Sequence, residues 1–312
     1  MAKFVHLHVH SEFSLLDGLG KLDQLISRTK EMGMDTLALT DHGAMYGSFK
    51  FYLKAKAAGL KPILGVETYV ARRSRLDKEG KIDTDPYHLV LLAKNDIGYR
   101  NLLKLVTHAH LDGYYYKPRI DWDLLKEYHE GIICLSACLA GQVPRLLMQD
   151  KIREAEEVAK KYAELFGPDH YYIELQKHPH IPEIDEVNEK LIALSRKLGL
   201  PLVATNDVHY VSSDDAEAQE ILLCVQTQRT IVEKNRPLSM MGSPDFYLRS
   251  PDEMSELFAQ YPEAIENTVK IASMCDITLS VGKWILPKFP VPEDQPPEEY
   301  LRVLVDERLP NR

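Results

Sequence analysis

The chain has 312 residues, of which 45% are hydrophobic and 27% are charged. These fractions are typical of a folded globular protein, and they exclude a disordered, collagen-like or disulfide-stapled chain. The net charge of −9 argues against nucleic-acid binding over the whole surface. A local site that recruits metal ions would still attract phosphate.

The sequence contains no run of about 18 consecutive apolar residues, which a membrane-spanning helix would need. The opening residues, MAKFVHLHVH, lack the basic and apolar parts of a secretory signal. The four cysteines are scattered and do not form a secreted disulfide framework. We therefore expect a cytoplasmic protein that makes no contact with a membrane.

Strand-like and helix-like segments alternate along most of the chain. The predicted strands are short, rich in Val, Ile, Leu or Tyr, and bounded by Gly, Pro, Asn or Asp. They are Phe4–His10, Thr36–Thr40, Lys61–Val70, Tyr87–Ala93, Gly131–Ser136, Tyr171–Leu175 and Pro201–Asn206. Segments with helical apolar spacing lie between them. This alternation predicts an α/β fold whose parallel strands close into a barrel.

The end of the chain has a different composition. Five prolines between Lys283 and Glu298 exclude a helix or central strand and predict an extended connector. A helix is expected to begin at Glu299. We therefore place a barrel domain over residues 1–280 and, over 281–312, the connector followed by the truncated start of another region.

Three histidines alternate with aliphatic residues in the first predicted strand. His6, His8 and His10 therefore share one face of that strand. A solvent-facing edge strand would carry the same pattern. One face of a barrel strand points inward, however, and buried imidazoles there need partners such as a metal ion.

Carboxylates and histidines also lie at the ends of three other predicted strands. Asp41 and His42 follow the second strand, Glu67 lies near the end of the third, and Asp207 and His209 follow the last. Each set alone is typical of a salt bridge or a helix cap. Because the carboxyl ends of parallel barrel strands meet at one mouth, the sets together predict a metal site.

Six segments in chain order resemble the successive motifs of the PHP (polymerase and histidinol phosphatase) family. They are HLHVHSEFSLLDG at 6–18, LTDHG at 39–43, GVE at 65–67, THAHLDGYYYKPRID at 107–121, LSACLAG at 135–141 and TNDVHY at 205–210. The resemblance covers the whole chain and is closest to the PHP domains that begin bacterial replicative DNA polymerases. It implies a distorted (β/α)7 TIM-like barrel that binds three divalent metal ions.

Matched motif by motif, the resemblance also implies a set of metal ligands. These are His8, His10, Asp17, His42, Glu67, His110, Cys138, Asp207 and His209. His108 is the alternative to His110 within the THAH segment. The mixed nitrogen, oxygen and sulfur donors suit Zn, Mn or Fe. We expect His88 to cap or pack against its own strand and His178 to lie at the surface, and we assign no role to Glu174.

The resemblance implies metal-dependent hydrolysis of phosphoesters. Asp17, Glu67 and Asp207 are the expected catalytic carboxylates, because they would hold the ions that activate water. Arg119 is the candidate phosphate clamp, since a guanidinium can match a phosphate with two parallel hydrogen bonds. An ordinary surface ion pair is the alternative for Arg119.

The expected activity is 3′–5′ proofreading exonuclease activity at the 3′ end of DNA, with the rest of a polymerase chain as partner. Two alternatives fit the same residues. One is a catalytically silent, metal-stabilised scaffold that docks a separate proofreading exonuclease subunit. The other is a stand-alone phosphatase for a small phosphomonoester, against which the polymerase-like end of the chain argues.

Overall fold

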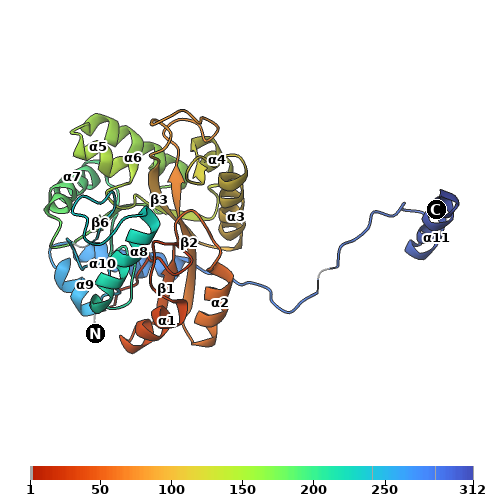
Figure 1. The fold of residues 1–312 in the computed structure, drawn as a ribbon, viewed down its shortest axis with the longest axis horizontal. Helices are drawn as coiled ribbons and strands as arrows, with labels where there is room; N and C mark the ends of the chain where they lie inside the picture. The colour runs from red at the N-terminus through yellow and green to blue at the C-terminus, as the bar shows by residue number, and fades with distance from the viewer. Residues whose placement is uncertain (1–2, 241, 285, 312) are drawn as a thin grey trace. The chain divides into compact units, whose positions relative to one another are not determined.

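The computed structural model describes residues 3–240, 242–284 and 286–311. It comprises two compact units, Met1–Ile277 and Thr278–Arg312. The first unit contains a central sheet surrounded by helices (Figure 1). None of the helices within the described ranges is long and apolar enough to cross a membrane.

A seven-stranded sheet forms the centre of the first unit. Its strands are β1 Thr36–Leu39, β2 Lys61–Val70, β3 Tyr87–Ala93, β4 Arg119–Ile120, β5 Ile132–Leu135, β6 Tyr171–Gln176 and β7 Leu202–Thr205. The strand order is β1-β2-β3-β5-β6-β7, and the short β4 pairs with β2. Six of the predicted strands are confirmed, each to within one residue at either end, whereas β4 was not predicted.

One strand departs from the expected parallel arrangement. β3 runs antiparallel to both β2 and β5, whereas the β1–β2, β5–β6 and β6–β7 pairs are parallel. Parallel neighbours require a crossover connection, usually a helix, but the link between β2 and β3 contains no helix. The chain therefore returns at the same end of the sheet. As a result, β3 begins where the parallel strands end.

The first predicted strand, Phe4–His10, is extended backbone rather than a regular strand. It nevertheless bonds to both edges of the sheet. The amides of Ala38 and Thr40 donate to its carbonyls (3.0 and 2.8 Å), and the amide of His10 donates to the carbonyl of Val208, beyond β7 (2.7 Å). This segment therefore connects β1 to β7 and closes the ring, which confirms the predicted barrel-like α/β fold class.

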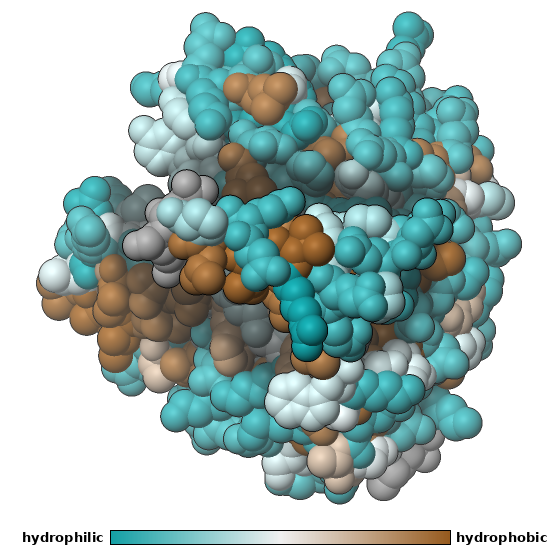
Figure 2. Space-filling model, turned by 90° about the vertical axis from the view of Figure 1, so that its right-hand side faces the viewer, coloured by the Kyte–Doolittle hydropathy of each residue, from teal (hydrophilic) through white to brown (hydrophobic). Residues whose placement is uncertain are grey.

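Helices surround the sheet of the first unit. They are α1 Leu22–Glu31, α2 Ser48–Ala57, α3 Asp96–Leu111, α4 Trp122–Tyr128, α5 Gln142–Met148, α6 Ile152–Phe166, α7 Pro182–Leu198, α8 Ala216–Thr227, α9 Pro251–Leu257 and α10 Pro262–Met274. Helix α6 shows how they pack, since it buries Ala155, Ala159, Tyr162 and Phe166 along one stripe. The face drawn in Figure 2 is mostly hydrophilic, with hydrophobic side chains interspersed.

The second unit contains one α-helix within the described residues, α11 Pro297–Arg308. Residues 278–284 and 286–296 form neither helix nor strand, as their prolines predict. The helix begins two residues before the expected Glu299, because Pro297 occupies its first turn. Proline is favoured there, where its missing N–H would have no partner within the helix.

Candidate metal centre

Most of the predicted metal ligands converge at one end of the sheet. They form three groups, and within each group the candidate donor atoms all lie within 4.8 Å of one another. The groups are His10, Asp17, His42 and His209; His8, His10, Glu67 and Asp207; and His42, Glu67 and His88. Because His10, His42 and Glu67 are each shared between two groups, the three candidate cation positions are neighbours.

The fold explains why these side chains meet. His8 and His10 stand two residues apart on the extended segment between β1 and β7, so they point to the same side. His42 follows β1 and forms a parallel bridge with Glu67 of β2. Asp207 follows β7 in a left-handed backbone conformation (φ 49°). Such strain in a residue other than glycine is concentrated at functional sites.

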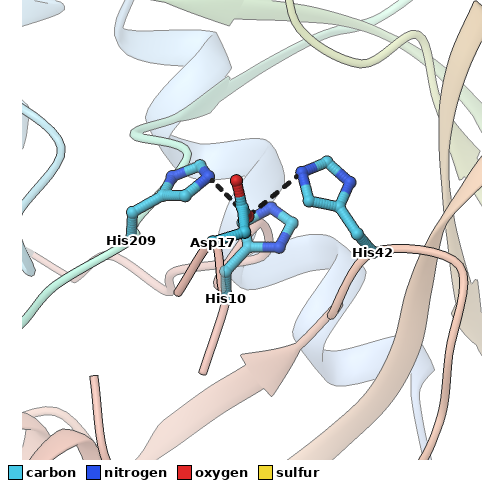
Figure 3. A group of neighbouring side chains, drawn as sticks. All are labelled: His10, Asp17, His42 and His209. Atoms are coloured by element: carbon cyan, nitrogen blue, oxygen red, sulfur yellow. Dashed lines mark ion pairs between the residues drawn. The ribbon is translucent and has the colours of Figure 1, made fainter. Parts of the chain in front are cut away.

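Asp17 lies among three imidazoles (Figure 3). Its Oδ2 atom is 3.3 Å from Nε2 of His209 and 3.4 Å from Nε2 of His42. The ring of His10 stacks on the rings of both His42 and His209, with centroid separations of 4.3 and 4.4 Å. Burial alone would raise the pKa of Asp17, but His209 and His42 lower it well below its usual range. This side chain is therefore a carboxylate.

The second group brings imidazole nitrogens and carboxylate oxygens together in a buried position. Nε2 of His8 and Nε2 of His10 each lie 3.2 Å from Oδ1 of Asp207, and 3.4 and 3.2 Å from Oε2 of Glu67. These four atoms are buried and have no hydrogen-bond partner with acceptable geometry in the described part of the chain. Unpartnered buried polar atoms are costly, and a cation between them would bind all four.

The same carboxylates alter the protonation of the imidazoles. Burial alone would lower the pKa of His10, but Asp207 and Glu67 outweigh it and raise that pKa to about 10. The pKa of His8 is also raised, against its burial, by Asp207, Glu174 and Glu67. A divalent cation would replace these protons as the positive charge, which is how metal binding is linked to proton release.

His88 joins the centre, although the sequence pattern predicts that it caps or packs against its own strand. Its Nδ1 atom lies 2.9 Å from Oε1 of Glu67 and 3.8 Å from Sγ of Cys138. The reversal of β3 places His88 at the mouth of the barrel. The one sequence signal for this position of His88 is that the segment before β3 has no helical pattern, which indicates that β3 reverses direction.

Cys138, which follows β5, lies beside His88 and Glu67. Its Sγ atom lies 3.9 Å from Oε1 of Glu67. Burial and the nearby carboxylates of Glu67 and Asp207 raise the pKa of the thiol well above its usual range. A metal ion beside the sulfur would reverse this effect, because a coordinated thiol is deprotonated.

His110 does not reach the centre. It lies on α3, where its Nε2 atom is 3.1 Å from the hydroxyl of Tyr46 and its Nδ1 atom is 2.9 Å from the carbonyl of Val106. The alternative, His108, pairs with a carboxylate at the end of the same helix. The structure therefore brings His88, rather than either histidine of the THAH segment, to the cluster.

Arg119 is not available to clamp a phosphate. Its side chain is 0% exposed. Its guanidinium donates to four backbone carbonyls at 2.8–3.1 Å, those of Gly113, Asp83, Arg75 and Asp77. Neither predicted role of Arg119, phosphate clamp or surface ion pair, therefore fits its buried position. Arg119 fastens the loop between β2 and β3 to β4.

Glu174, on β6, orients one of the central histidines. Its Oε1 atom accepts hydrogen bonds from Nδ1 of His8 (2.7 Å), the hydroxyl of Thr205 (2.5 Å) and the amide of Gln176 (3.0 Å). This contact fixes the His8 ring with Nε2 toward the cluster, as carboxylates commonly do for metal-binding histidines. The alternation of β6 shows that Glu174 faces inward but does not reveal its partner.

A cavity of about 390 Å³ opens beside the cluster. The clustered side chains in its lining are Asp17, His42, His88, Cys138, Asp207 and His209. Lys117 is the one lysine or arginine in this lining within the described residues. Its Nζ atom lies 5.2 Å from the centroid of the Tyr69 ring. A ligand in the cavity could therefore contact both the cluster and the ammonium group of Lys117.

This barrel and its histidine–carboxylate cluster define a protein of the PHP class. The family model described as "PHP domain" matches residues 6–178, more than half of the chain. The chain therefore belongs to the PHP domain family, and the resemblance seen in its motifs is confirmed.

The chain is also similar to curated proteins named "DNA polymerase III subunit alpha". The one from Borreliella burgdorferi is 47% identical over 311 residues, covering 99% of this chain and 27% of that protein. The one from Treponema pallidum is 48% identical over 311 residues, covering 99% and 26%. The one from Thermus aquaticus is 44% identical over 312 residues, covering 97% and 25%. The chain thus spans about a quarter of the length of these relatives.

Solved structures show a weaker similarity. An amidohydrolase from Chromobacterium violaceum, with bound sulfate and no metal, aligns with a TM-score of 0.43 and 16% identity, covering 68% of this chain and 89% of that one. A histidinol phosphate phosphatase from Lactococcus lactis, complexed with zinc, L-histidinol and phosphate, aligns with a TM-score of 0.36 and 14% identity, covering 71% and 92%.

Proposed function

We propose that the cluster binds three divalent metal ions, which are Zn, Mn or Fe. The proposed ligands are His8, His10, Asp17, His42, Glu67, His88, Cys138, Asp207 and His209. The observation that carries this proposal is the set of four buried atoms on His8, His10, Glu67 and Asp207 that face one another without hydrogen bonds. The donor set fits the ions, since imidazole, carboxylate and thiolate together suit these three metals.

The activity we propose is hydrolysis of a phosphodiester, with removal of nucleotides from the 3′ end of DNA. Divalent ions in such a site acidify water and neutralise the charge of a phosphate. The chain supplies the positions of those ions. Glu67 connects two groups, because its Oε1 atom faces His88 while its Oε2 atom faces His8 and His10.

The other two proposed catalytic carboxylates have separate positions. Asp17 lies between His42 and His209, and Asp207 lies beside His8 and His10. Lys117 takes the place of Arg119 as the side chain that contacts phosphate, because it lines the cavity and its ammonium group can follow a bound anion.

The names of the curated relatives support a wider assignment for the chain. We propose that it is the N-terminal PHP domain of a bacterial replicative polymerase in the cytoplasm, with the barrel domain over residues 1–280. Residues 281–312 would lead into the polymerase region. Its partners would then be DNA and the rest of the polymerase chain. A separate proofreading exonuclease subunit is a partner only under the scaffold alternative.

The test combines metal content with cleavage by the same preparation of the 312-residue chain. Metal per chain is measured by mass spectrometry, and removal of a mispaired 3′ nucleotide from a DNA primer is followed with and without a chelator. Asp207→Asn removes a proposed ligand, and Asp214→Asn, at an exposed carboxylate, is the matched control.

About three ions per chain with cleavage that the chelator and Asp207→Asn both abolish would support the full proposal. Three ions without cleavage would refute the exonuclease and favour the scaffold. Absence of metal, or unchanged metal and activity in Asp207→Asn, would refute the metal centre.

A further inference from the structure

Part of the lining of the cavity beside the cluster is apolar. Besides Ala140, it contains six larger apolar side chains, here called the apolar wall: Leu139, Ile181, Ile184, Leu238, Met240 and Phe246. A charged phosphate group alone would gain no binding energy from contact with these apolar side chains. A volume of about 390 Å³ also lies within the range of pockets that bind whole small molecules rather than single ions.

One polar side chain stands in this wall without a partner. His178 follows β6 and is 2% exposed. Its ring stacks on Phe246, with centroids 4.2 Å apart and an interplanar angle of 27°. Neither ring nitrogen has a hydrogen-bond partner within the described residues. A buried polar atom left unpartnered is destabilising, and a ligand with a matching donor or acceptor would remove that cost.

His178 can act as both donor and acceptor. Burial lowers its pKa to about 4, so the ring is neutral at pH 7. A neutral imidazole carries one N–H donor and one acceptor nitrogen. That combination matches the edge of a nucleobase or the hydroxyl of a sugar.

The strand order places Lys117 and His178 at different strands around the mouth of the barrel. Lys117 lies over Tyr69 of β2, whereas His178 follows β6, and β3 and β5 separate these strands in the sheet. A ligand that touches both must therefore extend across the mouth. A phosphate joined to a flat, largely apolar group has this form.

We propose that the apolar wall and His178 form a nucleoside subsite, which holds the base and sugar of the nucleotide being released while its phosphate faces the cluster. This inference rests on the proposed exonuclease function and deepens it. The cavity would then select nucleotides over sugar phosphates and free phosphate. Phe246 keeps His178 in place by stacking on it, and its carbonyl accepts the amide of His209 at 2.8 Å.

The test measures equilibrium binding to the Mn²⁺-loaded 312-residue chain by calorimetry. The probes are thymidine 5′-monophosphate and 2-deoxyribose 5-phosphate, which share a sugar and a phosphate and differ by the base. We expect the nucleotide to bind at least about tenfold more tightly. His178→Ala should remove most of this preference, and His129→Ala, at a partly exposed histidine outside the cavity lining, should retain it.

A second variant tests the subsite independently in case His178→Ala does not fold. Leu238 is 39% exposed at the cavity, so Leu238→Trp can fill the subsite without disturbing the core. It should weaken nucleotide binding more than sugar-phosphate binding. Equal affinity of wild type for the two probes, or no nucleotide binding, would overturn the subsite. Preserved nucleotide preference without primer cleavage would refute the exonuclease while leaving the subsite intact.

Discussion

The Nδ1 atom of His88 lies 2.9 Å from Oε1 of Glu67, and the two side chains come from antiparallel neighbours, β3 and β2. In an all-parallel barrel, a residue at the start of a strand lies at the end away from the active site. The reversal of β3 brings the start of that strand to the mouth. The direction of one strand therefore decides whether His88 packs against its own strand or joins the cluster.

His88→Ala is expected to lower the metal content by about one ion per chain, because it removes a donor from the third group. His110→Ala is the matched control and should leave the metal content unchanged, since its ring bonds to Tyr46 and Val106. Mass spectrometry of the two purified variants measures both. Metal loss in His110→Ala with full loading of His88→Ala would restore the ligand set implied by the motifs.

Local pattern predicts much of the centre, because strand alternation depends only on neighbouring residues. It places His8 and His10 on one face and puts Glu67 and Asp207 near strand ends. It cannot reveal partners that are distant in the chain. His6 shares the face of His8, yet its Nε2 atom lies 2.8 Å from the carbonyl of Arg249 and takes no part in the cluster.

The local sequence pattern likewise cannot predict the direction of β3 or the burial of Arg119. The strand Tyr87–Ala93 has the same composition whichever way it runs, and its pairing partners are set by the fold. Arg119 has the chemistry of a phosphate clamp whether its guanidinium meets solvent or buried carbonyls. The sequence therefore identifies the family and most of the clustered side chains, but not the direction of β3 or the role of Arg119.

Arg119→Met is expected to lower the free energy of unfolding by about 3 kcal/mol or more, because it leaves buried carbonyls without a donor. Urea unfolding followed by circular dichroism measures the loss. Arg153→Met, at an exposed position on α6, is the control and should change stability by less than about 0.5 kcal/mol. A stable Arg119→Met variant that no longer binds phosphate would instead assign the arginine to the substrate.

Glu174→Gln should weaken metal binding about 10- to 100-fold while the barrel stays folded. The amide cannot accept from His8 with the strength of a carboxylate, so the ring loses its fixed orientation. Competition with a coloured chelator measures the affinity. Glu183→Gln, at an exposed glutamate on α7, should bind metal like wild type. Equal affinity in Glu174→Gln would show that His8 is held in place by packing alone.

His178 is expected to make the protein less stable in acid. Burial lowers its pKa to about 4 in the folded protein, with Arg249 and His209 acting in the same direction and Asp207 and Asp245 opposing them. The unfolded chain has an ordinary histidine pKa of about 6.5. Between these two values only the unfolded chain takes up the proton, so the free energy of unfolding falls as the pH falls.

His178→Gln removes this proton uptake. When the pH is lowered from 7.5 to 4.5, the free energy of unfolding of the variant should therefore fall by about 2 kcal/mol less than that of wild type. Urea unfolding at both pH values measures the difference, in which the pH dependence shared by the two proteins cancels. His129→Gln, at a partly exposed position, is the control and should show the same loss as wild type. Parallel losses in wild type and His178→Gln would mean that the folded protein protonates His178 as readily as the unfolded chain does.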